Sequence, residues 1–441
     1  MGRLFFVMLL TFLTTEAFSQ LPKINFVEFE LENGLKVFLH QDNSVPVVAI
    51  TVAYHVGSKN EKPDRTGFAH FFEHLMFEGS ENIKRGEYFK YVQNAGGQLN
   101  AFTSFDKTVY YEVLPSNQLE LGLWLESERM LHLKIDSVGV ETQRGVVKEE
   151  RKQSYENRPY GSVMEEIFKR AYKEHPYRWV PIGSAQYIDQ AKLEEFIEFH
   201  NTFYVPNNAA LCISGDINID EAKELVKKYF GDIPRGKKEI YRPKIVEPPL
   251  GGEVRDVVYD NIQLPAVIIA YRIPAQGTPE YYALNVASTI LSGGESSRLY
   301  KEIVDRKKIA LQVGAFPFSL EDPGIYMVFS IASMGKTPEE LENAIDEEIE
   351  KFKNEPISDK ELEKAMNQIE KDFAEQTSSN LSIAMALTNY YLFFGDANLI
   401  NTEFERYKKI TKEDVQKAAK NFLNKDNRVI LYYLPKAKKQ G

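Results

Sequence analysis

The sequence contains a single cysteine, Cys212, so the chain cannot form an internal disulfide. Cys212 lies in the apolar run 209–214, where we expect a packed core thiol. Positive charge is also scarce: 54 basic residues stand against 64 acidic ones, and the 441-residue chain has a net charge of −10. Nucleic-acid-binding proteins usually carry an excess of basic residues, so we expect no nucleic-acid partner.

Long apolar runs are absent after the first two dozen residues, so we expect no stable membrane span. The one pronounced run, residues 4–13, follows Arg3 and precedes the small-residue site Ala17-Phe18-Ser19. This order is typical of a secretory signal peptide, which we assign to residues 1–19. An uncleaved membrane anchor and a misassigned start are the alternatives. A cleaved signal would place the protein in a bacterial periplasm or outside the cell.

Histidine is missing from the second half, because all seven histidines lie between positions 40 and 200. Two of them, His70 and His74, fall in the apolar segment 67–77 together with Glu73. Residues four apart project from the same face of an α-helix, so these imidazoles can chelate one metal ion, and a neighbouring carboxylate can act as a general base. A lone histidine on an apolar helix is more often a hydrogen-bonded core residue. The pair at chelating spacing favours a zinc site of the inverted HxxEH type.

A catalytic zinc site needs a third protein ligand and an open position for water. Residues 141–153 read as a helix, and its stripe at i, i+3, i+4, i+7 consists of Gln143, Val146, Val147 and Glu150. We expect this stripe to face inward, which makes Glu150 the candidate ligand. Glu149 falls on another side, where a solvent-exposed ion pair is the ordinary expectation. Taken alone, Glu150 would also be read as a surface or capping residue.

These residues resemble the pitrilysin and insulinase family of metallopeptidases, which includes the mitochondrial processing peptidase and smaller bacterial members. The resemblance covers nearly the whole chain after the first two dozen residues, and its markers are His70, Glu73, His74 and the segments 96–103, 146–151 and 293–300. It implies that His70, His74 and Glu150 bind Zn²⁺ and that Glu73 activates the water. Many members carry a glutamate seven residues before the third ligand. Gln143 occupies that position here, and its amide can orient a neighbour but cannot act as a base.

The chain also contains an internal repeat. A helix, a turn and a strand that begin at 194 recur from 413, an offset of 219 residues, and the strand-like runs 48–55 and 267–274 keep this offset. A Gly-Gly pair follows in each copy, at 96–97 and 293–294. We therefore predict an α+β fold of two homologous domains, each a mostly antiparallel sheet covered by helices. We place the domains at 20–233 and 253–441, joined by a Pro/Gly-rich linker at 234–252.

The two copies differ in chemistry, because the helix expected at 281–291 has no histidine and only the N-terminal domain can build the metal site. The resemblance implies that the second domain is a wall and substrate clamp, and that the chain forms half of a clam-shell peptidase. Members with a working clamp often carry an arginine and, seven residues later, a tyrosine; Val304 and Leu311 hold these positions, and neither can stabilise an oxyanion. We therefore hypothesise a heterodimer whose homologous partner supplies the pair. The alternative is a homodimer in which Arg298 or Arg306 takes this role.

Peptide binding is predicted for Leu99, Asn100, Ala101 and Phe102, which precede the strand-like run 108–113. If they form a sheet edge beside the metal, an extended peptide can add as a further strand; an ordinary hairpin is the alternative. The predicted function is a zinc-dependent endopeptidase for extended or unfolded peptides. A non-catalytic peptide-binding or assembly subunit is the main alternative, and a zinc-stabilised structural module is the weaker one.

Overall fold

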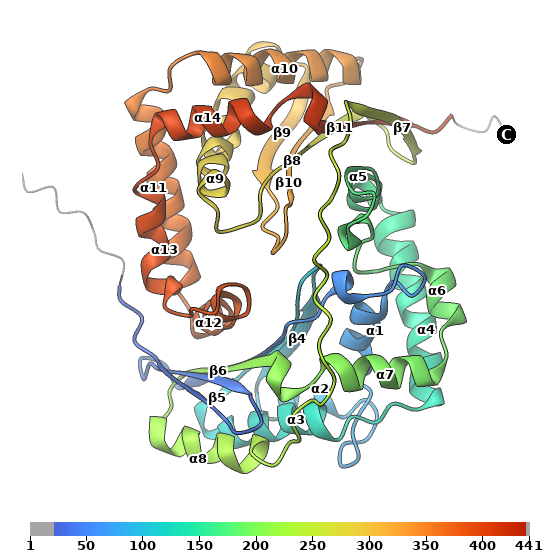
Figure 1. Cartoon of the computed structure of the whole chain (residues 1–441), viewed down its shortest axis with the longest axis vertical. Coiled ribbons are helices and arrows are strands. Elements are labelled where there is room, and N and C mark those ends of the chain that lie inside the picture. Colours follow the sequence, from blue (N-terminus) through green and yellow to red (C-terminus); the bar gives the residue numbers. More distant parts are fainter. Residues whose placement is uncertain (1–21, 438–441) are drawn as a thin grey trace, which may run out of the picture.

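The computed structural model describes residues 22–437, so the signal peptide expected at 1–19 lies outside the described residues. The chain folds into two β-sheets with helices packed on them, and the N-terminal half, blue to green, lies below the C-terminal half, yellow to red (Figure 1). None of the helices within residues 22–437 combines the length and the apolar character that crossing a bilayer would require. The architecture is the α+β fold of two similar halves that the sequence predicts.

The first sheet has six strands in the order β1-β2-β6-β3-β5-β4, and it is antiparallel except for the pair β2–β6. Its strands are β1 Val27–Glu30, β2 Lys36–Gln41, β3 Val47–Tyr54, β4 Gln98–Thr103, β5 Thr108–Pro115 and β6 Ala209–Gly215. The helices of this half are α1 Phe68–Leu75, α2 Tyr88–Asn94, α3 Leu119–Leu131, α4 Ser137–Arg151, α5 Val163–Ala171, α6 Ala185–Gln190, α7 Leu193–Phe203 and α8 Ile219–Phe230.

The second sheet has five strands in the order β7-β11-β8-β10-β9, and only the pair β7–β11 is parallel. Its strands are β7 Val254–Asp260, β8 Ala266–Arg272, β9 Ala310–Pro317, β10 Ile325–Ala332 and β11 Arg428–Pro435. The helices of this half are α9 Pro279–Ser292, α10 Pro338–Asn354, α11 Asp359–Gln376, α12 Asn380–Phe394, α13 Leu399–Tyr407 and α14 Lys412–Phe422. Residues 234–253, between α8 and β7, contain neither helix nor strand; the exact domain limits remain a prediction.

The repeat is visible in the strand order, because β6, β3, β5 and β4 of the first sheet match β11, β8, β10 and β9 of the second. β6 begins at Ala209 and β11 at Arg428, which preserves the offset of 219 residues. The two Gly-Gly pairs, however, are not equivalent. Gly96 and Gly97 lead directly into β4, whereas Gly293 follows α9 and a π-helical segment, Tyr300–Arg306, still precedes β9. Glycine is favoured after any helix, so the pairs mark the ends of different helices.

The two halves exchange a helix. α12 of the C-terminal half packs on β3 and β6 of the first sheet, where Ile383 and Leu387 join Phe38 and Cys212 in one apolar cluster. In return, α5 of the N-terminal half packs on β8 and β11 of the second sheet. Cys212 is fully buried in this contact, which confirms the packed core thiol. Each half therefore completes the apolar covering of the other.

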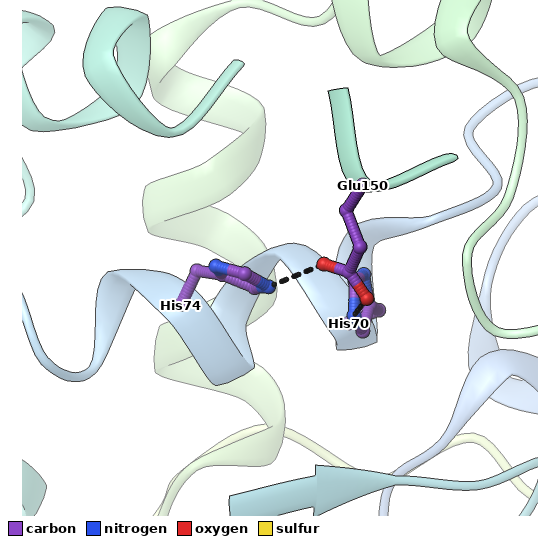
Figure 2. A group of neighbouring side chains, drawn as sticks. All are labelled: His70, His74 and Glu150. Carbon is purple, nitrogen blue, oxygen red and sulfur yellow. Dashed lines mark ion pairs between the residues drawn. The ribbon is translucent and has the colours of Figure 1, made fainter. Parts of the chain in front are cut away.

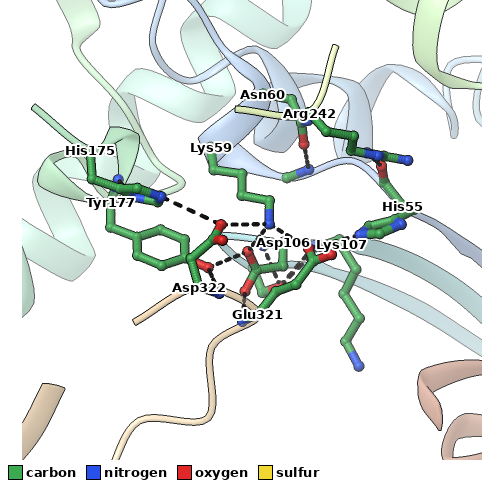
Figure 3. Close-up of polar contacts among 12 residues, drawn as sticks. His55, Lys59, Asn60, Asp106, Lys107, His175, Tyr177, Arg242, Glu321 and Asp322 are labelled. Atoms are coloured by element: carbon green, nitrogen blue, oxygen red, sulfur yellow. Dashed lines mark hydrogen bonds and ion pairs between the residues drawn. The ribbon is translucent and has the colours of Figure 1, made fainter. Parts of the chain in front are cut away.

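A buried polar cluster also joins the halves (Figure 3). Lys59, only 3% exposed, lies 3.0 Å from Asp106 of its own half and forms ion pairs with Glu321 and Asp322 in the turn between β9 and β10. His55 Nε2 lies 2.8 Å from Glu321 Oε2. We call this set the Lys59 cluster: His55, Lys59, Asp106, His175, Tyr177, Glu321 and Asp322. It fixes the β9–β10 turn against the N-terminal half.

Candidate metal centre

The helix α1 is anchored by one aromatic face. Phe68 and Phe71 pack on Phe196 of α7 with ring centroids 4.6 and 4.7 Å apart, and Phe72 stacks on Phe199 at 5.7 Å. All three α1 rings are buried in the main core. These aromatic residues belong to the core, and they fix the rotation of the helix that carries the two histidines.

The N-terminus of α1 is capped from a distance. Gly67 precedes the helix with φ of +100° and has no side chain to cap it. Instead the carboxylate of Glu61 accepts hydrogen bonds from the backbone N–H groups of Gly67 and Ala69, both at 2.9 Å. Burial raises the pKa of Glu61 to about 8, although these hydrogen bonds oppose the shift. Glu61 thus satisfies two of the free N–H groups of the helix start. Sequence reasoning missed it, because its role depends on a loop folding back.

Glu150 stands in the last turn of α4, and this turn is tied to its surroundings. The guanidinium of Arg151 donates to both carboxylate oxygens of Glu165 on α5, at 2.9 Å each. Val147 is buried, but Val146 is 45% exposed. The expectation that Val146 belongs to the inward stripe was therefore wrong, because the buried face of α4 is narrower than the four-residue stripe.

The structure brings His70, His74 and Glu150 together from α1 and α4 (Figure 2). His70 Nε2 lies 3.5 Å from Glu150 Oε1, and His74 Nε2 lies 3.1 Å from Glu150 Oε2. Hydrogen bonds from the two histidines hold the pKa of Glu150 well below its usual range, so this carboxylate is ionised. The side chains are 11%, 22% and 38% exposed in this order, and the group is therefore open to solvent on one side.

Glu73 projects beside this group towards the sheet edge. Its Oε2 accepts a hydrogen bond of 2.6 Å from the Thr103 hydroxyl at the end of β4. In the described part of the chain β4 pairs only with β5, so it forms the free edge of the first sheet next to α1. Alternation along β4 turns Leu99 and Ala101 to the same face as Thr103, and Asn100 and Phe102 to the other. Thr103 escaped notice in the sequence, because the partner of a hydroxyl cannot be read from spacing.

Gln143 lies two helical turns before Glu150 and contacts a different residue. Its Nε2 donates to Glu78 Oε1 at 2.5 Å, while its own Oε1 is buried without a partner within residues 22–437. No hydrogen bond in this part of the chain joins it to the two histidines or to Glu150. A supporting role at the metal site remains a prediction.

Val304 and Leu311 hold the two positions at which related peptidases often carry the clamp arginine and tyrosine. Both are apolar and lie in the C-terminal half. Val304 is partly buried against the second core, and Leu311, the second residue of β9, is 58% exposed. The two alternative arginines are engaged elsewhere: Arg298 donates to Glu361 at 2.6 Å, and Arg306 pairs with a glutamate one helical turn away.

Two histidines and a glutamate that converge from two helices, beside a further glutamate and an open sheet edge, make an arrangement suited to a metallopeptidase. Residues 36–179 match the family described as "Insulinase (Peptidase family M16)", and residues 190–369 match "Peptidase M16 inactive domain". The second match falls largely on the half that has no histidine. The chain belongs to the M16 family of peptidases, and the predicted resemblance is confirmed.

Several relatives support the assignment. The zinc protease PqqE of Helicobacter pylori is 34% identical over 375 residues, which cover 84% of each chain. The uncharacterized zinc protease YmxG of Bacillus subtilis is 26% identical over 80% of this chain and 86% of its own. The crystal structure of a protease from Helicobacter pylori matches with a TM-score of 0.89 and 30% identity, covering 93% of this chain and all of that one (100%). The periplasmic protease PqqL of Escherichia coli, at 18% identity, shares the fold: this chain spans 48% of it with a TM-score of 0.76.

Proposed function

We propose that this protein is a zinc-dependent endopeptidase that cleaves extended or unfolded peptides, with His70, His74 and Glu150 as metal ligands and Glu73 as general base. The observation that carries the proposal is the convergence of these three ligand groups, whose candidate atoms all lie within 4.8 Å of one another. The names of the relatives, which are zinc proteases, support the choice of metal.

The spacing of the ligand atoms fits zinc. With bonds of about 2.0–2.1 Å, two ligand atoms of a tetrahedral zinc site lie roughly 3.4 Å apart. His70 Nε2 lies 3.5 Å from Oε1 of Glu150 and His74 Nε2 lies 3.1 Å from Oε2, and with one oxygen as ligand all three ligand atoms lie within 4.8 Å of one another. Three protein ligands leave a fourth position free, which is the pattern of a catalytic rather than a structural zinc site.

When bound, Zn²⁺ supplies a Lewis acid that lowers the pKa of a water molecule and polarises a carbonyl group. Glu73 accepts the proton of the attacking water and then delivers it to the leaving amine nitrogen. The Thr103 hydroxyl holds one oxygen of Glu73 and leaves the other for this transfer. The ionised Glu150 would offer the metal a negatively charged ligand beside the two neutral imidazoles.

Substrate binds as an additional strand along β4, with Leu99, Asn100, Ala101 and Phe102 forming the contact. The free edge of β4 supports this, because its unpaired backbone groups can hydrogen-bond an extended peptide. Most strands of a folded protein are already paired within their own sheets, so we expect short or unfolded chains as the substrate class.

The active assembly contains a homologous partner subunit, and a heterodimer is favoured over a homodimer. The apolar side chains of Val304 and Leu311 support a missing clamp, and the pairing of Arg298 with Glu361 and of Arg306 with Glu302 supports assigning these two arginines to other contacts. A partner with an arginine and a tyrosine at these two positions would complete the site.

The protein acts outside the cytoplasm, in a bacterial periplasm or in the extracellular space. The signal-peptide pattern of residues 1–19 supports export. A structural relative, PqqL of Escherichia coli, is described as periplasmic.

The test compares wild type with Glu73→Gln and His74→Ala. Wild type should bind one zinc per chain by elemental analysis and, together with its partner subunit, cleave a fluorogenic unstructured peptide. Glu73→Gln should keep the zinc but lose about 10²- to 10⁴-fold in rate, because the general base is gone. His74→Ala should lose both.

Glu149→Gln is the matched control, because Glu149 is 57% exposed and forms polar contacts only with Gln153 and Lys152, close to it in the sequence, among the described residues. It should change neither zinc content nor rate. If Glu73→Gln cleaves as fast as wild type, the assignment of the base is wrong. A zinc-free wild type would overturn the metal site, and a zinc-bound protein that holds peptides uncut even with its partner would be a binding subunit.

A further inference from the structure

A cavity of about 660 Å³ lies between the end of β4 and the helices α9, α11, α12 and α13 of the C-terminal half. Its volume is within the usual range of ligand sites, roughly 300–1,000 Å³. Phe102 of β4 and Lys107, just beyond β4, line it from the N-terminal half. It therefore opens beside the strand along which the peptide is proposed to bind, on the face opposite to Thr103 and Glu73.

Lys107 is the distinctive group of this cavity. Its ammonium donates to Asn389 Oδ1, a neutral acceptor, and lies 5.6 and 5.5 Å from the ring centroids of Phe102 and Phe393. Figure 3 shows its side chain turned away from the Lys59 cluster. Among residues 22–437 no carboxylate forms an ion pair with it. Burial lowers the pKa of Lys107 to about 8, although the charge of the neighbouring Asp106 opposes the shift.

A second donor faces the same cavity. Gln276 lines it, and its Nε2 is buried with no acceptor within the described residues. An ammonium with only a neutral partner and an amide N–H without a partner both gain from an acceptor that carries negative charge.

The acidic residues of the cavity do not fill this role. Glu403 accepts from the hydroxyls of Tyr282 and Tyr390. Glu375 pairs with Lys371 at 2.5 Å, and its side chain is 63% exposed at the rim. Asp372, the third acidic residue of the lining, accepts from Gln368 at 3.0 Å, and none of the three carboxylates forms an ion pair with Lys107 among the described residues.

We propose that this cavity binds a carboxylate of the substrate peptide, either an acidic side chain or the C-terminal carboxylate, through the Lys107 ammonium and the Gln276 amide. The inference rests on the proposed function, because the peptide must lie along β4. Side chains of an added strand alternate between the two faces of the sheet, so every second residue can project into the cavity while its neighbours face the metal helix. The enzyme therefore prefers peptides with a negative charge at one defined place near the cleaved bond.

Binding to the zinc-loaded Glu73→Gln protein tests this without requiring turnover. The probes are fluorescent ten-residue peptides with neutral side chains and an amidated C-terminus, read by anisotropy. One series replaces a single Gln by Glu at each position in turn, and another peptide carries a free C-terminal carboxylate. One of these changes should tighten binding by about 10- to 100-fold, the range of a charge-assisted hydrogen bond. The series that responds identifies the source of the carboxylate.

Lys107→Met in the same background should abolish the preference while neutral peptides still bind, and Lys107→Arg should retain most of it. Lys223→Met, on the outer helix α8, removes the same charge far from β4 and should preserve the preference. A preference that survives Lys107→Met overturns the proposal. The proposal is also overturned if Glu and Gln peptides bind equally and the free C-terminal acid binds no better than the amide. This comparison uses protein with Lys107 intact, so it holds even if the Lys107→Met variant does not fold. Equal binding of all peptides would leave the proposed endopeptidase function standing. Failure to bind any peptide would contradict the proposal that substrate adds as a strand along β4.

Discussion

Lys59→Met should be the most destabilising single change at the contact between the two halves. Lys59 is 3% exposed and faces Asp106, Glu321 and Asp322, so removing its charge leaves three carboxylates close together. Breaking a buried ion pair from one side costs about 3–5 kcal/mol. Glu321 and Asp322 keep 25% and 32% of their side chains exposed, so water screens them in part and we expect the lower end, about 3 kcal/mol.

Urea unfolding followed by tryptophan fluorescence measures this loss. Trp179 is a suitable reporter, because its indole N–H donates to the carbonyl of Ser58, next to Lys59. With a denaturant slope of about 3 kcal/mol per molar or more, the midpoint should fall by up to about 1 M.

The control for this experiment is Lys62→Met, three residues away on an exposed position, which should change stability by less than about 0.5 kcal/mol. Adding Asp322→Asn to Lys59→Met should recover part of the loss, because one repelling charge is removed. If Lys59→Met unfolds at the same urea concentration as Lys62→Met, the cluster does not hold the halves together and the reasoning fails.

Two further predictions concern the assembly and pH. The purified chain alone should cleave peptides poorly and become active with a homologous chain that carries arginine and tyrosine at the positions of Val304 and Leu311; full activity of a monomer or homodimer, resolved by size exclusion, would contradict this. Burial raises the pKa of Asp322, but hydrogen bonding from His175 and the charge of Lys59 outweigh it and lower the pKa below 3.8. The ionised form therefore stabilises the fold, so the destabilisation by Asp322→Asn should be full above about pH 4 and shrink as pH falls through the folded-state pKa; a constant difference down to pH 2 would argue against it.

The parts of the site that the sequence predicts are those set by local geometry. His70 and His74 needed only helical spacing, whereas a sheet edge at residues 99–102 stood beside an ordinary hairpin as an alternative until the strand order placed β4 at the edge. Glu150 required both its helix and the family resemblance, because no local rule says that α4 approaches α1. The inward position of Val146 was wrong, since periodicity gives the direction of a buried face but not its width.

Other features depend on contacts between distant segments and left no local signal. Glu61 caps α1 across a loop, and Lys59 meets carboxylates more than 260 positions away. The apolar pattern of α5 and α12 shows that each helix buries one face, but not that each covers the sheet of the opposite half. The matching strand order could be foreseen from the 219-residue offset, whereas the helix exchange could not.

The exchanged helices occupy equivalent places in the repeat, because α5 shifted by 219 residues falls inside α12. A polypeptide with only one copy would leave one apolar side of its sheet bare to water. Such a unit could persist only by pairing with a second copy, each lending its helix to the other, as in a domain-swapped dimer. Because both copies are joined in one chain here, each sheet is always covered by the helix of the other copy. Either copy expressed separately would be expected to aggregate or to dimerise.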